Sequence, residues 1–404
     1  MMHCRVCSKP VEDVISFGPM PIANGFISTI AGDDCVFNMA VVFCPSCFMV
    51  QLKETVPPEK MFHDQYHFLS STSKAMAVHF EGNAREIIER LQGKPDPFIV
   101  ELGCNDGIML KHIAARGIRH LGIEPSGNVA DLAAKNNVRV TKEFFHKKTA
   151  EAIAAKDGKA DVICGSNVFC HIEDINSVFA GLAVLLKDDG YVYFEDPYLM
   201  DIVKKSSFDQ IYDEHVYYYS GLSVRELAKR HGLQLVDMVH QDVHGGSMRY
   251  YLKKGVSNPV SSNVEKFIAE EKALKLDRLE GYSAFKNNVN EVCRHLRQTL
   301  TEIKQQGGRV VGYGATSKST TLLNYAKIGP DLIEYISDNT PSKINTFTPG
   351  MHIPVKPYET FVKDHPPYTL LLAWNHRREI FEKEKDYRGK GGKFITFFPA
   401  VVIE

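Results

Sequence analysis

The chain has 404 residues, of which 44% are hydrophobic and 24% are charged, as in a globular protein of two to four domains. Its 48 basic and 49 acidic residues leave a formal net charge of −1, which removes the electrostatic attraction needed to bind nucleic acid or an anionic membrane surface. The sequence has neither a run of about 18 apolar residues nor the apolar core of a signal peptide. We therefore expect a cytoplasmic protein that binds neither nucleic acid nor a membrane.

Four of the nine cysteines form two CxxC pairs near the start of the chain. Cys4 and Cys7 lie in "CRVC" and Cys44 and Cys47 lie in "CPSC", a spacing that directs two thiolates from each turn toward one ion. Four thiolates fill a tetrahedral zinc site and leave no position for a water molecule. The pattern therefore predicts a structural zinc site in an N-terminal module of residues 1–65.

The next region, residues 66–258, alternates between helix and strand patterns. After a helix that begins near "SSTS" and ends near Leu91, "PFIVELGCNDGIML" indicates a strand, a glycine turn and a helix. "RHLGIEPS" predicts a strand that ends at Glu124, and "ADVICGSNV" predicts a strand that ends near Asn167. Because strands separated by helices form a parallel sheet, we expect a Rossmann-like domain with its ligand at the carboxyl ends of these strands.

The turn "ELGCNDG" has the pattern ExGxxxG and lacks the dinucleotide fingerprint GxGxxG. Glu101 precedes the turn, where it would repel a pyrophosphate and favour a cationic ligand, and Glu124 can accept hydrogen bonds from a ribose diol. The turn resembles motif I of class I S-adenosylmethionine methyltransferases, whose commoner form has a glycine where this chain has Asn105. The cofactor-binding residues that we expect are Glu101, Gly103, Asn105, Gly107, Glu124, Pro125, Ser126 and Asn167.

"DVHGGSMRYYLKK" indicates a loop followed by a strand, with His244 in the loop and Arg249 in the strand. A guanidinium at this place can pair with a diphosphate or a carboxylate. An exposed arginine of a strand fits the pattern equally well.

The last third begins with a charged helical connector, residues 259–306, followed by a second α/β region, residues 307–404. "GGRVVGYGATSKSTTLLNYAK" predicts a strand, a glycine turn and a helix, and "LIEYISDNTPSK" predicts a strand that ends at Asp338. The incomplete fingerprint of this Rossmann-like domain disfavours bound NAD. Lys318 and the backbone amides near Gly314 suit a diphosphate, although Lys318 also fits a solvated lysine at a helix start.

As a whole, the chain resembles the sugar C-methyltransferases, because it has a four-cysteine module, a methyltransferase-like middle, "YDEHVYYYS", "HGGSMR", "GYGATSKSTTLLNY" and "SDNTPSKINTFTPGMHIPV" in one order. The resemblance implies methyl transfer from S-adenosylmethionine to carbon in a nucleotide-linked 4-keto-deoxy sugar, in deoxysugar biosynthesis. In this family the commonest substrate is linked to thymidine diphosphate and the commonest position is C3. Because the chain has its own substrate-binding lobe, we expect a monomer or a weak homo-oligomer.

The resemblance also implies roles for residues of "YDEH". Methylation of carbon needs a base that removes the proton next to the ketone, and the resemblance gives this role to His215. Glu214 is expected to orient the imidazole or bind a sugar hydroxyl, and Tyr212 to donate a hydrogen bond to the enolate. His171, in "NVFCHI", is the rival base and is otherwise expected to contact the sugar or the enolate oxygen.

The same resemblance implies that Tyr66 closes over the sugar, whereas packing of a loop aromatic is the alternative. The substrate-binding residues that we expect are Tyr66, His244, Arg249, Gly312, Gly314, Lys318 and Asp338.

Three other functions are compatible with parts of the sequence. Methylation of oxygen or nitrogen in a small molecule needs the same cofactor turn but makes the C-terminal lobe superfluous. A catalytically silent zinc-bearing binding protein would not need Glu101, Glu124 and His215. Oxidoreduction through the C-terminal lobe is disfavoured by its incomplete fingerprint.

Overall fold

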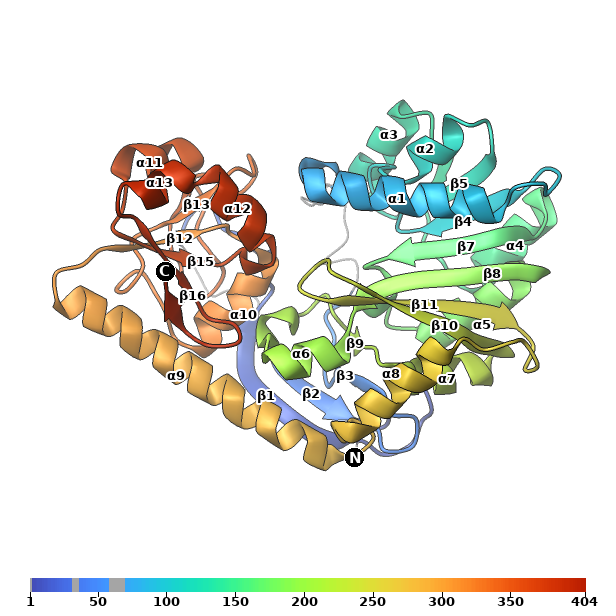
Figure 1. Cartoon of the computed structure of the whole chain (residues 1–404), viewed down its shortest axis with the longest axis horizontal. Coiled ribbons are helices and arrows are strands. Elements are labelled where there is room, and N and C mark those ends of the chain that lie inside the picture. The colour runs from blue at the N-terminus through green and yellow to red at the C-terminus, as the bar shows by residue number, and fades with distance from the viewer. Residues whose placement is uncertain (1, 31–35, 58–69) are drawn as a thin grey trace.

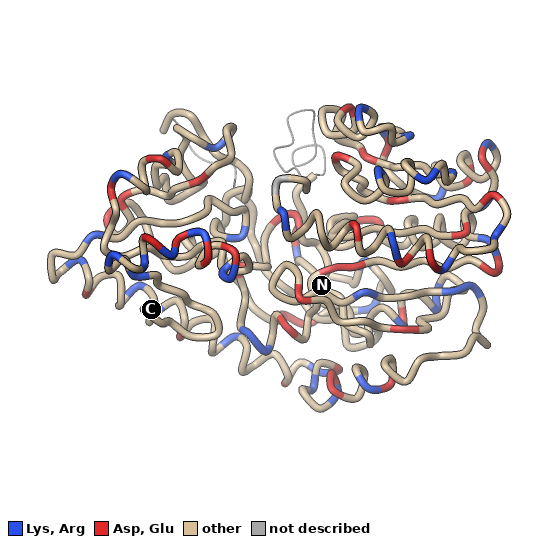
Figure 2. The backbone as a smooth tube through the Cα atoms, turned by 45° about the horizontal axis from the view of Figure 1, so that its top comes forward, with Lys and Arg blue, Asp and Glu red and all other residues tan. Residues whose placement is uncertain are grey.

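The computed structural model describes residues 2–30, 36–57 and 70–404, and the strands within these residues form three sheets (Figure 1). Two larger sheets lie in separate lobes, and the long helix α9, Ser283–Gln305, runs along the lower edge from one lobe to the other (Figure 1). Basic and acidic residues are interspersed along the backbone of both lobes (Figure 2).

The N-terminal sheet is antiparallel and is completed by a strand from far along the chain. Its order is β1-β2-β3-β9, and β9 pairs with β3 through Gln51 with Tyr217 and Val50 with Tyr218. The catalytic stretch that the sequence predicts therefore continues directly into the sheet of the cysteine module. The strands are β1 Glu12–Pro21, β2 Val36–Phe43, β3 Val50–Leu52 and β9 Tyr217–Tyr218.

The central sheet has the strand order β10-β11-β8-β7-β4-β5-β6. Strands β8, β7, β4, β5 and β6 are parallel, as the sequence predicts, whereas β11 and β10 are antiparallel to their neighbours. The arrangement is Rossmann-like, because the parallel strands are wound outward from β4 in both directions. The strands are β4 Phe98–Leu102, β5 Arg119–Ile123, β6 Val140–Thr141, β7 Ala160–Ser166, β8 Leu186–Pro197, β10 Leu233–Gln241 and β11 Ser247–Lys254.

Helices cover both faces of this sheet, because successive side chains of a strand point to opposite faces. Phe98, Val100 and Leu102 of β4 belong to one buried cluster, and Ile99 belongs to another. Helices α1, α2 and α3 contribute to the second cluster, and α4, α5 and α7 contribute to the first. The helices are α1 Lys74–Arg90, α2 Leu110–Ala114, α3 Gly127–Lys135, α4 Lys147–Asp157, α5 Ile175–Leu185, α6 Leu199–Lys205 and α7 Gly221–Arg230.

Local signals explain where several helices begin. Ser73, the last serine of "SSTS", accepts a hydrogen bond from the amide of Met76 and caps α1, as the sequence predicts. Ser220, at the end of "YDEHVYYYS", forms a capping box with Ser223 and starts α7. Such a cap contributes about 1 kcal/mol to helix stability.

The C-terminal sheet has the order β14-β13-β12-β15-β16-β17, which is the 3-2-1-4-5-6 order of a Rossmann fold with an antiparallel last strand. It confirms the predicted second Rossmann-like region. The strands are β12 Val310–Tyr313, β13 Ile336–Asp338, β14 Val355–Pro357, β15 Tyr368–Leu371, β16 Lys393–Thr396 and β17 Val402–Ile403. The helices of this lobe are α10 Ser317–Tyr325, α11 Tyr358–Asp364, α12 Arg377–Lys383 and α13 Lys385–Gly389.

The connector between the lobes consists of α8, Ser262–Ala273, and α9. One large hydrophobic cluster extends from Phe43 of β2 through Phe194 of β8 to Leu322 of α10. Burying each such side chain contributes about 1.5–3 kcal/mol, so the three sheets share one stabilising core. The domain boundaries expected from the sequence stay a prediction. No helix in the described ranges is long and apolar enough to cross a membrane.

Candidate active site and zinc site

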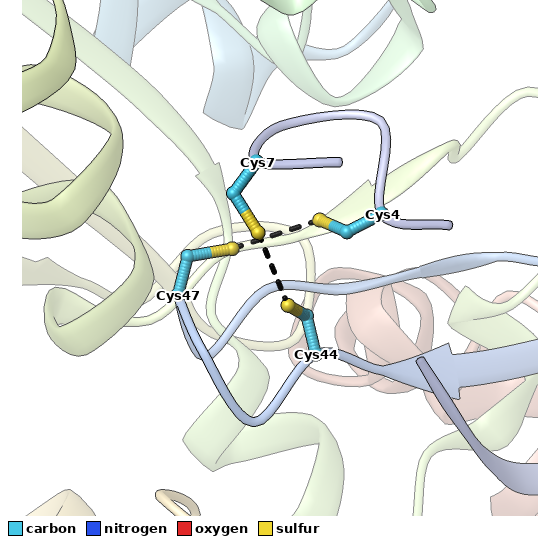
Figure 3. A group of neighbouring side chains, drawn as sticks. All are labelled: Cys4, Cys7, Cys44 and Cys47. Atoms are coloured by element: carbon cyan, nitrogen blue, oxygen red, sulfur yellow. Dashed lines mark hydrogen bonds between the residues drawn. The ribbon is translucent and has the colours of Figure 1, made fainter. Parts of the chain in front are cut away.

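The four predicted metal ligands meet in the N-terminal module. Figure 3 shows their sulfur atoms pointing toward one another, with Sγ atoms 3.6 Å apart in Cys4 and Cys47 and 3.4 Å apart in Cys7 and Cys44. A tetrahedral ion with zinc–sulfur bonds of about 2.3 Å needs sulfur atoms about 3.8 Å apart. All four ligand atoms lie within 4.8 Å of one another and are buried, so the donor set fits zinc.

The two CxxC turns have the same local structure. The amide of Ser8 donates to the carbonyl of Cys4, and the amide of Phe48 donates to the carbonyl of Cys44, both at 2.8 Å. The side-chain amide of Gln51 donates to Sγ of Cys4 at 3.1 Å, which stabilises a thiolate. With four sulfur ligands, the zinc is structural.

A cavity of about 1350 Å³ lies between the carboxyl ends of the two parallel sheets and the N-terminal module. It is large enough for a nucleoside cofactor and a nucleotide-linked substrate together. Eleven of the predicted site residues are among its lining, namely Gly103, Asn105, Glu124, Pro125, Asn167, His171, Tyr212, Glu214, His244, Lys318 and Asp338.

The glycine turn after β4 has the backbone that its residue types predict. Gly103 has φ +61°, and a Cβ there would lie 2.3 Å from a methyl group of Val168, so only glycine fits. Asn105 has φ +49°, a left-handed conformation that asparagine tolerates, and its side chain accepts from the amide of Ser70. Asparagine can therefore stand where the commoner motif has glycine.

Two acids flank this turn and create negative potential. Glu124 accepts from the amides of Asn105 at 3.1 Å and Ser126 at 2.9 Å, and it lines the cavity. Glu101 is buried, and its Oε2 has no hydrogen-bond partner in the described part of the chain. Burial and the charge of Asp106 raise the pKa of Glu101, so a bound cation would stabilise its carboxylate. The turn therefore fits the sulfonium and ammonium groups of S-adenosylmethionine.

Several predicted cofactor residues lie behind the cavity rather than in its lining. Gly107, with φ +77°, packs against Val138 and Ala133, and Ser126 is the N-terminal cap position of α3. The lining instead includes Asn128 and the stretch 143–146, which follows β6. The predictions made from the sequence did not include this stretch, although its aromatic pair "FF" was a usable signal.

The histidine of "YDEH" is not among the residues that line the cavity and lies directly behind Tyr212, which does line it. His215 is 1% exposed, its Nδ1 donates to the carbonyl of Gln210 at 2.7 Å, and the hydroxyl of Tyr212 donates to its Nε2 at 3.0 Å. A carbonyl can only accept, so Nδ1 carries the proton of the neutral ring and Nε2 carries the lone pair. Burial lowers the pKa of His215, and the proximity of Lys318 lowers it further. It is therefore neutral and can accept a proton.

The rival histidine lies beside it. The rings of His171 and His215 are perpendicular, with centroids 5.0 Å apart, and Nδ1 of His171 lies 3.7 Å from Oε2 of Glu214. Burial lowers the pKa of His171 to about 4, so its imidazole is neutral as well. Burial and the charge of Asp213 raise the pKa of Glu214 to about 8. The site thus contains two neutral imidazoles and one titratable carboxyl.

Cys170, His171 and His215 also place ligand atoms within 4.8 Å of one another. Both imidazole nitrogens of His215 already form hydrogen bonds, and burial raises the pKa of the Cys170 thiol. This donor set suits proton transfer better than metal binding. The tyrosines that follow are structural, because Tyr217 donates to the carbonyl of Glu173 and Tyr219 to that of Phe169.

The second glycine turn faces the same cavity. Gly312 is buried in β12, and Gly314, with φ +87°, packs against Ala373, so neither lines the cavity itself. Asp338 accepts from the amides of Ala315 at 2.6 Å and Thr340 at 2.7 Å.

Two lysines make this end of the cavity positive. Lys318 is half-buried rather than solvated, and burial lowers its pKa to about 8. The sequence analysis missed Lys343, which lines the cavity and donates to the carbonyl of Ala315 at 2.8 Å. Its position five residues after Asp338, which ends a predicted strand, was a usable signal.

Three further residues that the sequence predicts to bind substrate are His244, Arg249 and Tyr66. His244 has φ +53°, lines the cavity, and its carbonyl accepts from Lys318 at 3.4 Å. Arg249 is buried, pairs with Glu195 at 2.9 Å and Glu86 at 2.8 Å, and does not line the cavity. The alternative of an exposed strand arginine is therefore wrong. The pairing with a carboxylate is formed within the chain, because Glu195 and Glu86 hold this guanidinium inside the lobe, and substrate binding by Arg249 stays a prediction. Tyr66 lies outside the described residues.

Three family models match consecutive parts of the chain. They are "Putative zinc binding domain" at residues 4–62, "Methyltransferase domain" at residues 76–238 and "C-methyltransferase C-terminal domain" at residues 242–399. Their order is the order of the three sheets along the chain.

The chain is 32% identical to C-methyltransferase NovU of Streptomyces niveus over 401 residues, covering 98% of this chain and 95% of that protein. A ubiquinone biosynthesis O-methyltransferase of Nitrosomonas europaea is 27% identical over 140 residues, covering 34% of this chain and 60% of that one. Among solved structures, magnesium protoporphyrin IX methyltransferase of Synechocystis with bound SAH has 14% identity and a TM-score of 0.36, covering 45% of this chain and 88% of that one.

Proposed function

The chain belongs to the S-adenosylmethionine-dependent C-methyltransferase family, and from this premise we propose that it methylates the carbon next to the ketone of a nucleotide-linked 4-keto-deoxy sugar. The carbon is C3 in this proposal, and the nucleotide is thymidine diphosphate. The observation that carries the proposal is one cavity with an acidic turn at one end and a lysine-lined turn at the other. Between them, Tyr212 lines the cavity and is hydrogen-bonded to the neutral His215 behind it.

The histidine is the base of the proposed reaction. Nε2 of His215 carries a lone pair and contacts the hydroxyl of Tyr212, and it is Tyr212 that lines the cavity. A proton that leaves the substrate carbon passes to the oxygen of Tyr212 as the hydroxyl proton of Tyr212 moves to Nε2. The electron pair of the broken C–H bond moves onto the ketone oxygen and leaves an enolate.

Other residues of the cavity stabilise the enolate and orient the sugar. Neutral His171, at the edge of the cavity beside Glu214, donates a hydrogen bond toward the enolate oxygen. Glu214 accepts from a sugar hydroxyl. Lys318 and Lys343 bind the diphosphate at the start of α10, where the positive end of the helix dipole also favours an anion.

The cofactor end of the cavity is the acidic turn. Gly103, Asn105 and Glu124 line this end, and Glu101 is buried behind them rather than in the lining. Together they hold S-adenosylmethionine, which supplies an electrophilic methyl group when bound. The wall formed by α1 keeps water away from this end, because Met76 and Phe80 line it.

Enzyme-dependent hydrogen exchange tests the proposal. Wild-type protein with S-adenosylhomocysteine and a thymidine-diphosphate 4-keto-6-deoxy sugar in deuterated water is expected to exchange the C3 proton. His215→Asn keeps a donor toward the Gln210 carbonyl but loses the base, so exchange and methylation should fall by about a hundredfold or more. Affinity for S-adenosylmethionine should stay within about twofold of wild type, since only the base changes.

The matched control is His295→Asn, the same substitution on an exposed position of α9, and it should exchange like wild type. A methylated product without C3 exchange and with the methyl group on oxygen would reject C-methylation of this sugar. Exchange retained in His215→Asn would reject His215 as the base.

A further inference from the structure

One asparagine of the N-terminal module contacts both halves of the cavity. Asn24 lies in the turn after β1, and its side-chain amide nitrogen donates to Oε1 of Glu214. Its amide oxygen accepts from the hydroxyl of Ser317, the first residue of α10, at 2.7 Å. All three residues line the cavity. The predictions made from the sequence give no role to Asn24.

The backbone of this turn is fixed independently of the Asn24 side chain. The amide of Ala23 donates to Oδ1 of Asp213 at 2.8 Å, and the carbonyl of Ala23 accepts from the hydroxyl of Thr320 at 3.0 Å. Ala23 is 1% exposed. Removing the Asn24 side chain would therefore leave the turn held between the catalytic loop and α10.

We propose that Asn24 is a positioning residue that orients the carboxyl of Glu214 and makes this orientation depend on the first turn of α10. A primary amide has one donor end and one acceptor end, and here each end meets the partner that requires it. Ser317 precedes Lys318, so a diphosphate bound at this turn fixes Ser317, which fixes Asn24 and then Glu214. Substrate binding by one lobe thereby arranges a catalytic group of the other.

The charges around Glu214 determine how this contact affects its titration. The groups that face the carboxyl are Asp213 beside it, His171 of the central lobe and Lys343 of the C-terminal lobe. Burial and Asp213 raise its pKa, whereas the hydrogen bond from Asn24 and the charge of Lys343 lower it. Loss of the Asn24 amide should therefore raise the pKa of Glu214 further.

The inference rests on the proposed function for its kinetic readout, so the test includes a readout that needs no turnover. The infrared band of the Glu214 carboxyl is identified from the difference between wild type and Glu214→Gln. The pH titration of this band is then measured in Asn24→Ala, Asn24→Asp and Thr320→Val. Thr320→Val is the matched control, because it removes a hydrogen bond to the same turn without touching Glu214.

We expect the Glu214 titration to move to higher pH in Asn24→Ala and further in Asn24→Asp, with no movement in Thr320→Val. With the keto sugar, kcat should fall roughly tenfold to a hundredfold in Asn24→Ala, the scale of a misplaced catalytic group. Asn24→Ala should also move the Glu214-dependent limb of its pH profile.

An unmoved Glu214 titration in both Asn24 variants, or an equal movement in Thr320→Val, would overturn the inference. Failure of the proposed function is a separate result, because wild-type protein would then be inactive with the keto sugar while the Glu214 titration still differed between the variants. Wild-type kcat in Asn24→Ala would also reject the positioning role.

Discussion

In both Rossmann-like lobes an acidic side chain holds the glycine turn by the same hydrogen bonds, but the charges that surround the two turns are opposite. In the central lobe, Glu124 at the end of the second strand accepts from an amide of the turn and from the amide two residues after itself. In the C-terminal lobe, Asp338 does the same at the same place. The backbone geometry is thus shared, and it specifies a ligand site without specifying the ligand.

The difference lies in the side chains behind each turn. The central turn has the buried carboxyl of Glu101, whereas the C-terminal turn has the ammonium groups of Lys318 and Lys343. One turn therefore suits a cation and the other an anion, and they face each other across a single cavity. In the proposed function, the different charges placed on this repeated backbone let one chain bind two different ligands.

The glycines of the two turns offer the strongest way to break this comparison. A Cβ at residue 103 would lie 2.3 Å from Val168, and one at residue 314 would lie 2.7 Å from Ala373, both at positive φ. Gly103→Ala should weaken S-adenosylmethionine binding by about a hundredfold or more and Gly314→Ala should weaken binding of the nucleotide sugar instead. Calorimetric titration of each ligand on each variant measures both effects. Equal loss of both ligands in one variant would show that the turns are not separate sites.

Substitutions that remove a charge from one turn but keep the size of the side chain should change ligand affinity less than the glycine substitutions. Glu101→Gln should weaken S-adenosylmethionine by roughly tenfold to a hundredfold, the scale of one lost charge-assisted hydrogen bond, and leave thymidine diphosphate affinity unchanged. Lys318→Met should show the reverse pattern. Fluorescence titration with each ligand separates the outcomes. If Lys318→Met bound thymidine diphosphate as tightly as wild type, the second turn would not be the anion-binding turn.

The smallest effect is a pH dependence that only one turn should have. Burial lowers the pKa of Lys318 to about 8, and Asp209 opposes this shift. Lys318 is charged below that pH, so diphosphate affinity should fall severalfold between about pH 7.5 and 9, while Lys318→Arg stays charged and keeps its affinity. His244 and His376, which also face Lys318, are neutral over this range because burial lowers the pKa of each. A parallel loss in Lys318→Arg would assign the titration to another group.

The sequence predicts those parts of the fold and site that depend on local pattern. The CxxC turns, the strand that ends at Glu124 and the cap at Ser73 each follow from a few neighbouring residues. What it did not predict depends on contacts between distant segments. Asn24 meets Glu214 across 190 positions, and Arg249 meets Glu86 across 163, so no local pattern records either contact.

The role of Tyr212 shows the same limit within the catalytic stretch. The sequence places a tyrosine three residues before His215, which the resemblance interprets as an enolate donor. Only the folded loop brings its hydroxyl to Nε2 and identifies which nitrogen carries the proton. Side-chain direction in an irregular segment follows from its packing, which propensity does not determine.

The pairing of β9 with β3 has a consequence for how such an enzyme is inherited. A segment that interrupts the central lobe supplies the last strand of the first sheet, so recombination at either module border would leave a strand edge unpaired and prone to self-association. Gene fusion or loss should therefore act on the entire polypeptide.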